Sequence, residues 1–347
     1  MPRKPKTFLD VRWPESRQAG PRPNRSSYRD PRVLAAGAIA ALAGAALFVQ
    51  SRAREAERQN PPAGRFVDVD GVRLHYVERG RGEPLVLLHG NGALVQDFAT
   101  SGLIDMAAQK YRVITFDRPG YGYSDRPRNR VWTPEAQAAL LAQAFARLGL
   151  ERPVVLGHSW GTQVAVALGL DWARSVRSLV LLSGYYYPTA RIDVGLLSAP
   201  ALPVVGDLLR FTVSPLIGWL VWPLLLRKLF GPNPTPRHFD DFPKWMVLQP
   251  GQIRAAAEES ALMMPAAARL SRRYRRLALP VVIMAGTEDR VATTERQSAR
   301  FHQEVRGSTF DAVPGVGHMV HHIVPEAVLD AIDEAARRGG EAFGVAA

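Results

Sequence analysis

The spacing of apolar residues divides the chain into a short N-terminal segment and a long body. Residues Val33–Val49 carry no charge and show no polar face, so they predict a helix near the shortest length that crosses a bilayer. From Arg65 onward apolar and polar residues alternate, first around Asp70-Gly71, which is typical of a β-hairpin. Short unbroken apolar runs then predict strands buried on both faces. The predicted strands are Arg65–Val69, Val72–Arg79, Leu85–Leu88, Val113–Phe116, Val154–Leu156, Leu179–Leu182, Val281–Met284 and Thr309–Val313.

Longer segments with helical periodicity lie between these strands. Pro134–Leu148 follows Thr133, which is a capping residue placed before a proline in the first turn. Val164–Ala173 and Pro325–Arg338 also show helical periodicity. Strands that alternate with helices predict an α/β fold with a mostly parallel, doubly wound sheet. The two opening strands are expected to form its antiparallel edge.

The segment between Gly184 and about Leu279 is too long for one crossover and predicts an insertion in the core, which the family resemblance described below implies is a helical cap. The expected organisation is a basic arm (1–32), a transmembrane signal anchor (33–50), a linker (51–64), a core (65–184 and 280–338) interrupted by a cap or lid (185–279), and a C-terminal tail (339–347).

Three interpretations of the N-terminal apolar segment compete: an uncleaved signal anchor, a cleaved signal peptide and a soluble helix. The long basic region before it favours the anchor. A basic arm stays on the inner side of the membrane, so we expect a single-pass membrane protein whose body lies on the outer, periplasmic face. Three arginines in the linker weaken this charge asymmetry; they are Arg52, Arg54 and Arg58.

Composition excludes several classes of function. The net charge is +12, but residues 1–32 alone hold nine Lys and Arg against three acids, so the body is only mildly basic. No nucleic-acid-binding motif accompanies this charge, and we expect no nucleic-acid partner. The chain has no cysteine, which excludes disulfides, thiolate catalysis and cysteine-based metal sites.

A candidate nucleophile lies between a predicted strand and a predicted helix. Gly157-His158-Ser159-Trp160-Gly161 matches G-x-S-x-G directly after Val154–Leu156. In that context the glycines permit a tight turn, and the hydroxyl of Ser159 is exposed above the sheet. The alternative is that Ser159 is an ordinary loop serine between two glycines, without a catalytic role.

Serine needs an adjacent base, and the chain has eight histidines. His318 follows the strand Thr309–Val313 and completes the order nucleophile, acid, histidine. Asp289 follows Val281–Met284 and is the predicted acid, which orients the histidine. The neighbours that we did not choose are His158, His321 and His322 for the base and Glu288 for the acid.

The oxyanion of an acyl-transfer reaction needs preorganised N–H donors. We assign them to the backbone N–H of Trp160, which follows the nucleophile, and to that of Asn91, in the loop after Leu85–Leu88. His89, Gly90 and Gly92 complete that loop. This chemistry needs no metal and no organic cofactor.

With these motifs in place, the chain resembles the α/β-hydrolase superfamily from about Arg65 to Arg338. Four segments carry the resemblance in the expected order: His89–Gly92, Asp117–Ser124, Gly157–Gly161, and Gly286–Asp289 with Gly317-His318. The resemblance implies a serine triad of Ser159, Asp289 and His318 under a cap. The segment Asp117–Ser124 is a structural loop in that family, and we assign it no chemistry.

One local feature is similar to the haloalkane dehalogenases, which hold halide with an asparagine and a tryptophan at the positions of Asn91 and Trp160. Those enzymes and the related epoxide hydrolases use an aspartate nucleophile, whereas this chain has Ser159. The resemblance therefore implies common ancestry with acyl chemistry in place of attack on an alkyl carbon.

The cap contains an uncharged stretch, Phe211–Leu226, which Pro215 and Pro223 are expected to interrupt. It predicts lid helices packed on the core, or else an acyl pocket or a face that rests on lipid. We therefore expect a hydrolase that cleaves a small or medium carboxylic ester with a hydrophobic acyl or alcohol group through an acyl-enzyme. The alternatives are an amidase, a C–C hydrolase or a cofactor-free perhydrolase with the same triad, and a non-catalytic binding protein of the same fold.

Overall fold

The computed structural model describes residues 30–189, 195 and 197–344. The chain divides into two compact units, Met1–Ala43 and Gly44–Ala347. The helix α1 (Pro31–Gln59) contributes residues to both units. The rest of the described structure belongs to the larger unit, which contains the sheet and every candidate site residue.

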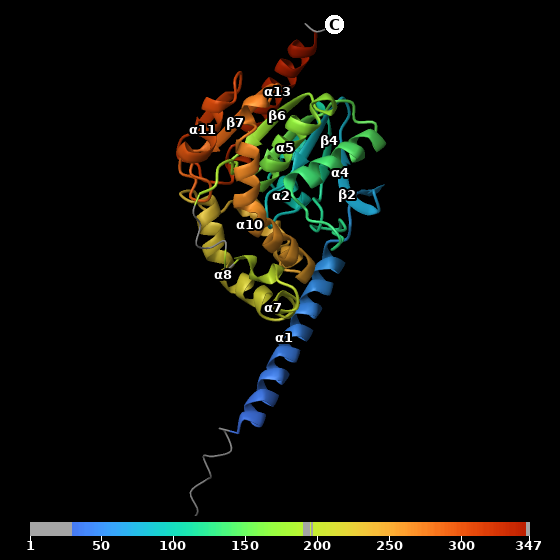
Figure 1. Ribbon diagram of the computed structural model, residues 1–347, viewed down its shortest axis with the longest axis vertical. Coiled ribbons are helices and arrows are strands. Elements are labelled where there is room, and N and C mark those ends of the chain that lie inside the picture. Colours follow the sequence, from blue (N-terminus) through green and yellow to red (C-terminus); the bar gives the residue numbers. More distant parts are fainter. Residues whose placement is uncertain (1–29, 190–194, 196, 345–347) are drawn as a thin grey trace, which may run out of the picture. The chain divides into compact units, whose positions relative to one another are not determined.

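The larger unit is built on one eight-stranded sheet with the order β1-β2-β4-β3-β5-β6-β7-β8 (Figure 1). The pairs β1–β2 and β2–β4 are antiparallel, and the pairs from β4 to β8 are parallel. The predicted mostly parallel sheet with an antiparallel edge is therefore confirmed. The strands are β1 (Arg65–Val69), β2 (Val72–Arg79), β3 (Glu83–Leu88), β4 (Tyr111–Phe116), β5 (Val154–His158), β6 (Ser178–Leu182), β7 (Val281–Gly286) and β8 (Thr309–Val313).

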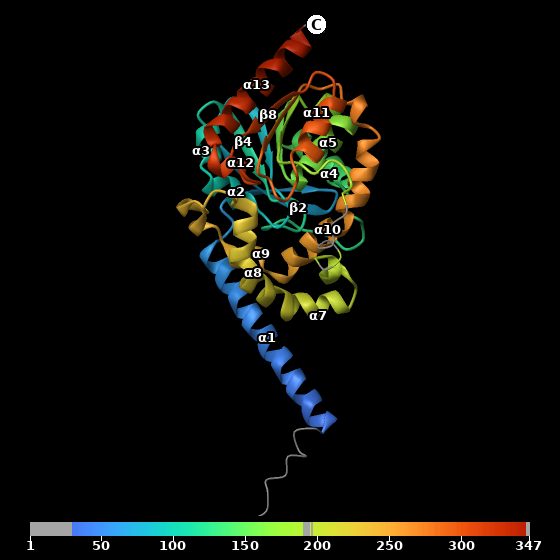
Figure 2. The same ribbon diagram turned by 90° about the vertical axis from the view of Figure 1, so that its left-hand side faces the viewer.

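Helices cover both faces of this sheet because its central strands are apolar on both sides. Successive residues of β3 alternate between two cores: Val86 and Leu88 pack with one, Leu85 and Leu87 with the other. Figure 2 shows α4 and α5 on one face and α3 and α13 on the other. The flanking elements are α2 (Val95–Thr100), α3 (Leu103–Ala107), α4 (Pro134–Arg147), α5 (Trp160–Asp171), η2 (Ala173–Ser175), η6 (Glu295–Ala299), α11 (Arg300–Glu304), α12 (Val320–Ile323) and α13 (Pro325–Gly344).

The start of α4 shows how local sequence sets an element boundary. Thr133 caps this helix, and its hydroxyl oxygen accepts a hydrogen bond from the backbone N–H of Ala136 at 3.2 Å. Pro134 occupies the first turn, where its missing N–H leaves no bond unmade. The predicted start of this helix is confirmed.

The linker predicted at 51–64 is wrong over most of its length, because α1 continues to Gln59. Residues 51–59 are rich in alanine and in charged residues that favour helices, and Glu55 pairs with Arg58 one turn later. The side chain of Ala56 is buried against the body, in a cluster with Phe230 and Met246. Tertiary packing therefore extends the helix to the Pro61-Pro62 pair.

The segment between β6 and β7 is helical, as predicted for a cap. Its described elements are η3 (Ala199–Ala201), α7 (Val205–Phe211), α8 (Val213–Phe230), η4 (Arg237–Asp241), α9 (Lys244–Val247), α10 (Pro250–Ser271) and η5 (Tyr274–Arg276). The expectation that Pro215 and Pro223 interrupt the apolar stretch is wrong, since α8 runs unbroken from Val213 to Phe230. Pro215 lies in the first turn, where no N–H bond is lost, so only Pro223 removes an internal bond.

Candidate active site

The candidate nucleophile occupies a strained turn between β5 and α5. Ser159 has φ 52° and ψ −119°, a backbone conformation that residues other than glycine rarely adopt. The chain is crowded there: a Cβ atom on Gly157 would lie 2.6 Å from the carbonyl oxygen of Gly161, and one on Gly161 would overlap the backbone of Leu88. Glycine is therefore required at both positions, and the turn is the tight, strained one that this motif predicts.

The structure brings the three predicted catalytic residues together. Nε2 of His318 lies 2.9 Å from Oγ of Ser159, and its Nδ1 lies 2.7 Å from Oδ2 of Asp289. His318 and Asp289 are 2% and 5% exposed. Each follows a strand, β8 and β7 respectively, so the carboxyl ends of parallel strands deliver the residues to one edge of the sheet.

The surroundings of Asp289 fix its orientation. Its Oδ1 accepts hydrogen bonds from the backbone N–H groups of Val291 and Ala292, at 2.7 and 2.9 Å. Oδ2 therefore remains to accept from Nδ1 of His318, which leaves Nε2 as an acceptor that faces the serine hydroxyl. Glu288, the neighbouring acid that we did not choose, is exposed.

The two residues assigned to the oxyanion donors flank the nucleophile, but their side chains bind the cap. Trp160 is the first residue of α5, where a backbone N–H has no partner within the helix. Its indole Nε1–H donates to the carbonyl oxygen of Glu259 at 3.1 Å. The side-chain amide of Asn91 donates to the carbonyl oxygen of Ala256 and to Oγ of Ser260, both at 3.1 Å. Both side chains are thus tied to α10.

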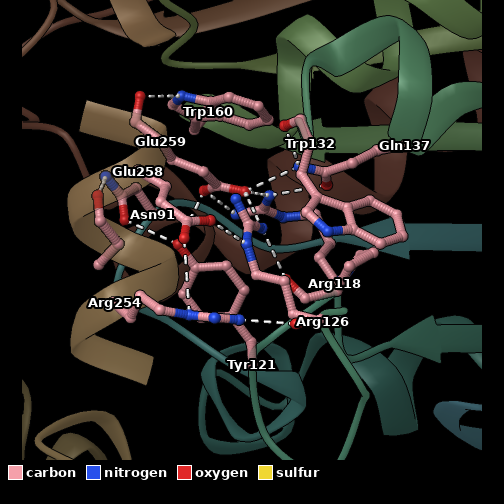
Figure 3. Close-up of polar contacts among 12 residues, drawn as sticks. Asn91, Arg118, Tyr121, Arg126, Trp132, Gln137, Trp160, Arg254, Glu258 and Glu259 are labelled. Carbon is pink, nitrogen blue, oxygen red and sulfur yellow. Dashed lines mark hydrogen bonds and ion pairs between the residues drawn. The ribbon is translucent and has the colours of Figure 1, made fainter. Parts of the chain in front are cut away.

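A buried ion pair between Arg118 and Glu259 lies at the centre of this region (Figure 3). Both side chains are fully buried, and their two bonds measure 2.5 and 3.0 Å. Burial, the largest single influence, opposes ionisation of Glu259, but the charge and hydrogen bonds of Arg118, together with Arg126 and Gln137, hold its pKa below the usual value. Two more donors bind the Glu259 carboxylate: the side-chain amide of Gln137 in α4, at 2.9 Å, and the hydroxyl of Tyr121, at 2.8 Å.

Arg118 also holds the loop that carries Asn91. Its Nε–H donates to the carbonyl oxygen of His89 at 2.7 Å, and one terminal nitrogen donates to that of Gly90 at 2.9 Å. The backbone N–H of Arg118 donates to Nε2 of His89 at 3.0 Å. We assigned no chemistry to Asp117–Ser124, and sequence reasoning missed that its arginine joins the Asn91 loop to α10.

His89 itself is neutral. Its Nδ1 lies 2.8 Å from the carbonyl oxygen of Gly90, which can only accept, so Nδ1 carries the proton and Nε2 accepts from Arg118. Burial, reinforced by the nearby Arg118 charge, lowers the pKa of His89 to about 4.

The histidines that we excluded as bases form a second buried group around Asp97. Nε2 of His321 and Nε2 of His322 lie 3.2 and 3.0 Å from its two oxygens. Burial opposes ionisation of Asp97, but these histidines lower its pKa well below the usual range. His158 turns away from the hydroxyl, and its Nε2 donates to the carbonyl oxygen of His318 at 3.1 Å. Within the described part of the chain, Asp97, His158 and His321 are the group whose ligand atoms lie close enough, within 4.8 Å, to hold a metal.

A cavity of about 240 Å³ opens at the serine. Ser159, His318 and Asn91 lie at its polar end. The remaining wall is mostly apolar and comes largely from the cap. It consists of Trp222, Leu225, Leu226 and Leu229 of α8, Phe239 of η4, Phe242 directly after η4, and Met263 of α10. The site can therefore hold a hydrophobic group beside a nucleophile and its base.

Comparisons with known proteins identify the family of the chain. The model of the alpha/beta hydrolase family matches residues 85–331. An uncharacterised protein of Mycobacterium tuberculosis (strain H37Rv) is 30% identical over 285 residues, which cover 79% of this chain and 81% of that protein. Haloalkane dehalogenase 2 of the same organism is 30% identical over 128 residues, which cover 37% of this chain and only 44% of the dehalogenase.

A solved structure extends the likeness to the fold. Cfl2 from Burkholderia cenocepacia superposes with a TM-score of 0.64 and 22% identity, and covers 78% of this chain and 94% of that chain. This comparison concerns the fold alone.

We predict that Glu259→Gln destabilises the protein by about 3 kcal/mol, because it leaves the buried Arg118 charge without its counter-ion. Thermal unfolding of the full chain in mild detergent measures this. Glu341→Gln makes the same change in an exposed pair with Arg337 and should cost less than about 1 kcal/mol. Equal effects of the two substitutions would contradict the role given to the buried pair.

We also predict that stability falls as the pH is lowered from 6.5 towards 4. In that range the unfolded chain protonates His89 and the folded chain does not, because the folded pKa is about 4. Burial likewise lowers the pKa of His158 and of His321. The effect of His89 alone should lower the free energy of unfolding by about 1.4 kcal/mol for each unit that the pH falls within this window.

Urea unfolding midpoints between pH 7.5 and pH 5 check this expectation. Asp97, whose pKa is lowered, contributes stability that is lost only below its ordinary value of 3.8, so it leaves this window unaffected. His89→Gln should be less stable at neutral pH but should show a shallower slope. A wild-type midpoint that does not change with pH would refute the neutral, buried state of His89.

Proposed function

The chain belongs to the alpha/beta hydrolase family, and from that premise we propose that it is a serine hydrolase that cleaves a carboxylic ester with a hydrophobic acyl or alcohol group. The observation that carries the proposal is the hydrogen-bonded triad beside an apolar cavity. Nε2 of His318 lies 2.9 Å from Oγ of Ser159, and Nδ1 of His318 lies 2.7 Å from Oδ2 of Asp289. A serine activated by a histidine attacks acyl carbon, and the cavity favours a substrate with a hydrophobic group.

The proposed reaction proceeds in two steps. Nε2 of His318 accepts the proton of Ser159 while Oγ attacks the ester carbonyl, and Asp289 stabilises the imidazolium that forms. The backbone N–H groups of Trp160 and Asn91 stabilise the oxyanion. The intermediate expels the alcohol, which takes the proton from His318, and water then hydrolyses the acyl-enzyme by the same steps.

Two observations favour acyl chemistry over the dehalogenation named in one relative. The nucleophile position holds Ser159, and a serine that displaced halide would leave a stable ether on the enzyme instead of a hydrolysable ester. The side chains of Asn91 and Trp160 are bonded to α10, so neither is free to hold a halide ion.

The strained backbone at the serine favours an enzyme over a binding protein of the same fold. Residues in sparsely populated conformations cost about 1–3 kcal/mol each, and such strain gathers at active sites. Ser159 has this conformation directly beside a histidine that can deprotonate it. Binding alone gives no reason for this arrangement.

We further propose that α1 anchors the protein in a membrane, with the catalytic unit on the outer face. The helix is long and apolar enough to cross a bilayer, and only 6% of its apolar window is buried. The basic residues of 1–32 favour an inner position for the N-terminus.

We predict that Ser159→Ala lowers kcat for p-nitrophenyl esters by roughly 10⁴- to 10⁶-fold, because no other group replaces the nucleophile. The assay uses the full chain in detergent and an ester series from acetate to palmitate, whose preferred length reports the size of the cavity. Ser51→Ala, at an exposed position of α1, is the control and should retain wild-type rates. Wild-type protein that is folded but inactive on the whole series would rule out the esterase.

We predict no release of halide from 1-bromohexane or 1-chlorohexane by the wild-type protein. Ser159→Asp, which restores the dehalogenase nucleophile, should also release none, because α10 holds the side chains of Asn91 and Trp160. A halide-sensitive colorimetric assay measures this. Steady halide release by the wild-type protein would overturn the assignment to acyl chemistry.

A further inference from the structure

Helix α8 is apolar around its whole circumference and is nevertheless mostly uncovered. From Val213 to Leu226 it carries no charged residue, and only Pro215 and Phe230 of the whole helix are buried. Its exposed side chains include Ile217, Trp219, Leu220, Val221, Leu224 and Leu225. A helix that is apolar on all sides belongs in a protein core or in lipid, so a cover for α8 is expected.

The exposed apolar surface continues onto the neighbouring helix. In α7, Leu208 is 53% exposed and Phe211 is 48% exposed. Figures 1 and 2 both show α7 and α8 next to each other in the cap, at the end of the catalytic unit away from α13. We call the exposed side chains of α7 and α8 the cap face.

The part of α1 that belongs to the catalytic unit lies next to the same helices. The ring of Phe48 packs edge-on against Trp245 at 6.0 Å, and the guanidinium of Arg52 lies over that ring at 5.3 Å. Beside Trp245, Lys244 of α9 lies 5.7 Å from the ring of Trp219 on the cap face. The apolar run of α1 therefore ends, at Val49, beside the cap face, and a bilayer that holds the residues before Val49 would be tethered close to that face.

The basic residues near the end of α8 lie where a helix at the membrane interface requires them. After the apolar part, the last turn of α8 contains the exposed residues Arg227 and Lys228. Tryptophan and basic residues at the margin of an apolar surface are typical of helices that lie at the level of the lipid headgroups. Trp219 and these two residues supply both.

The same helix also lines the catalytic cavity. Trp222, Leu226 and Leu229 form part of its wall, and Leu225 both lines the cavity and is 40% exposed outside. Apolar side chains thus extend from the cap face to the cavity that holds Ser159. An acyl chain could follow them from lipid to the nucleophile without crossing bulk water.

We propose that the cap face docks into the lipid bilayer and that the substrate is a membrane-dissolved acyl ester, a lipid whose chain enters the cavity along α8. This inference rests on the proposed esterase function and adds the substrate class and its route. The bilayer is favoured over a second copy of this chain because the apolar run of α1 ends at the same face.

The test uses the full chain in phosphatidylglycerol/phosphatidylcholine vesicles with two substrates: soluble p-nitrophenyl butyrate and a long-chain diacylglycerol dissolved in the bilayer. The variant is Leu220→Gln/Leu224→Gln, because these side chains are 71% and 65% exposed and do not line the cavity. The control is Trp172→Gln, an exposed aromatic at the end of α5 remote from Ser159.

The double variant should keep the rate of butyrate hydrolysis within about twofold of the wild type. Its rate of lipid hydrolysis should fall about tenfold or more, because the two apolar side chains that would insert into lipid are replaced by polar ones. The control should keep both activities. If the double variant hydrolyses lipid as fast as the wild type, the docking proposal is overturned and the esterase stands. If the wild type hydrolyses neither ester, the proposed function fails first.

A second measurement reports the position of Trp219 directly. Lipids brominated on the acyl chain should quench more fluorescence in the wild type than in Trp219→Phe, because docking places this ring among the chains. Equal quenching, or a dimer in nanodiscs whose contact protects Trp219 from the bromolipid, would show that another surface covers α8 and would overturn the proposal.

Discussion

Arg118 and Glu259 are both fully buried, and each is tolerable there only because the other is present. Their contact therefore constrains everything attached to it: the loop that carries Asn91, the start of α4 through Gln137, and the cap helix α10. The indole of Trp160 binds the backbone of the same glutamate. The cap is thus fastened to the floor of the site beside the nucleophile, and the cavity has one fixed wall.

The sequence predicts the sheet and the catalytic residues because both depend on short-range patterns. Each central strand is a run of apolar residues, and Gly157 and Gly161 bracket Ser159 where the backbone leaves no room for a Cβ atom. His318 and Asp289 lie far from the serine along the chain, but parallel strands bring their ends to one edge, so chain order and position after a strand together predicted them. Asp289 and Glu288 follow the same strand, and we preferred Asp289 because Glu288 was expected to be a solvated loop acid.

The remaining features depend on contacts between distant residues, which a single sequence does not display. Arg118 and Glu259 are separated by 141 positions, and nothing local distinguishes them from other charged residues. The extension of α1 to Gln59 depends on the packing of Ala56, and the tolerance of Pro215 depends on where α8 starts. The side-chain bonds of Asn91 and Trp160 depend on the position of α10, which the motifs around those residues do not encode.

The all-round apolar character of α8 has a mechanical consequence. An amphipathic helix resists turning about its axis because turning would bury its polar stripe. The central part of α8 has no such stripe, so turning it would bury no charged side chain. The opposite side of the cavity, fixed by the sheet and by Arg118, has no such freedom. In the proposed reaction the ester bond would thus break beside the fixed wall, while the acyl chain would lie against a helix that has no polar stripe to fix its rotation, so one site could fit chains of several shapes.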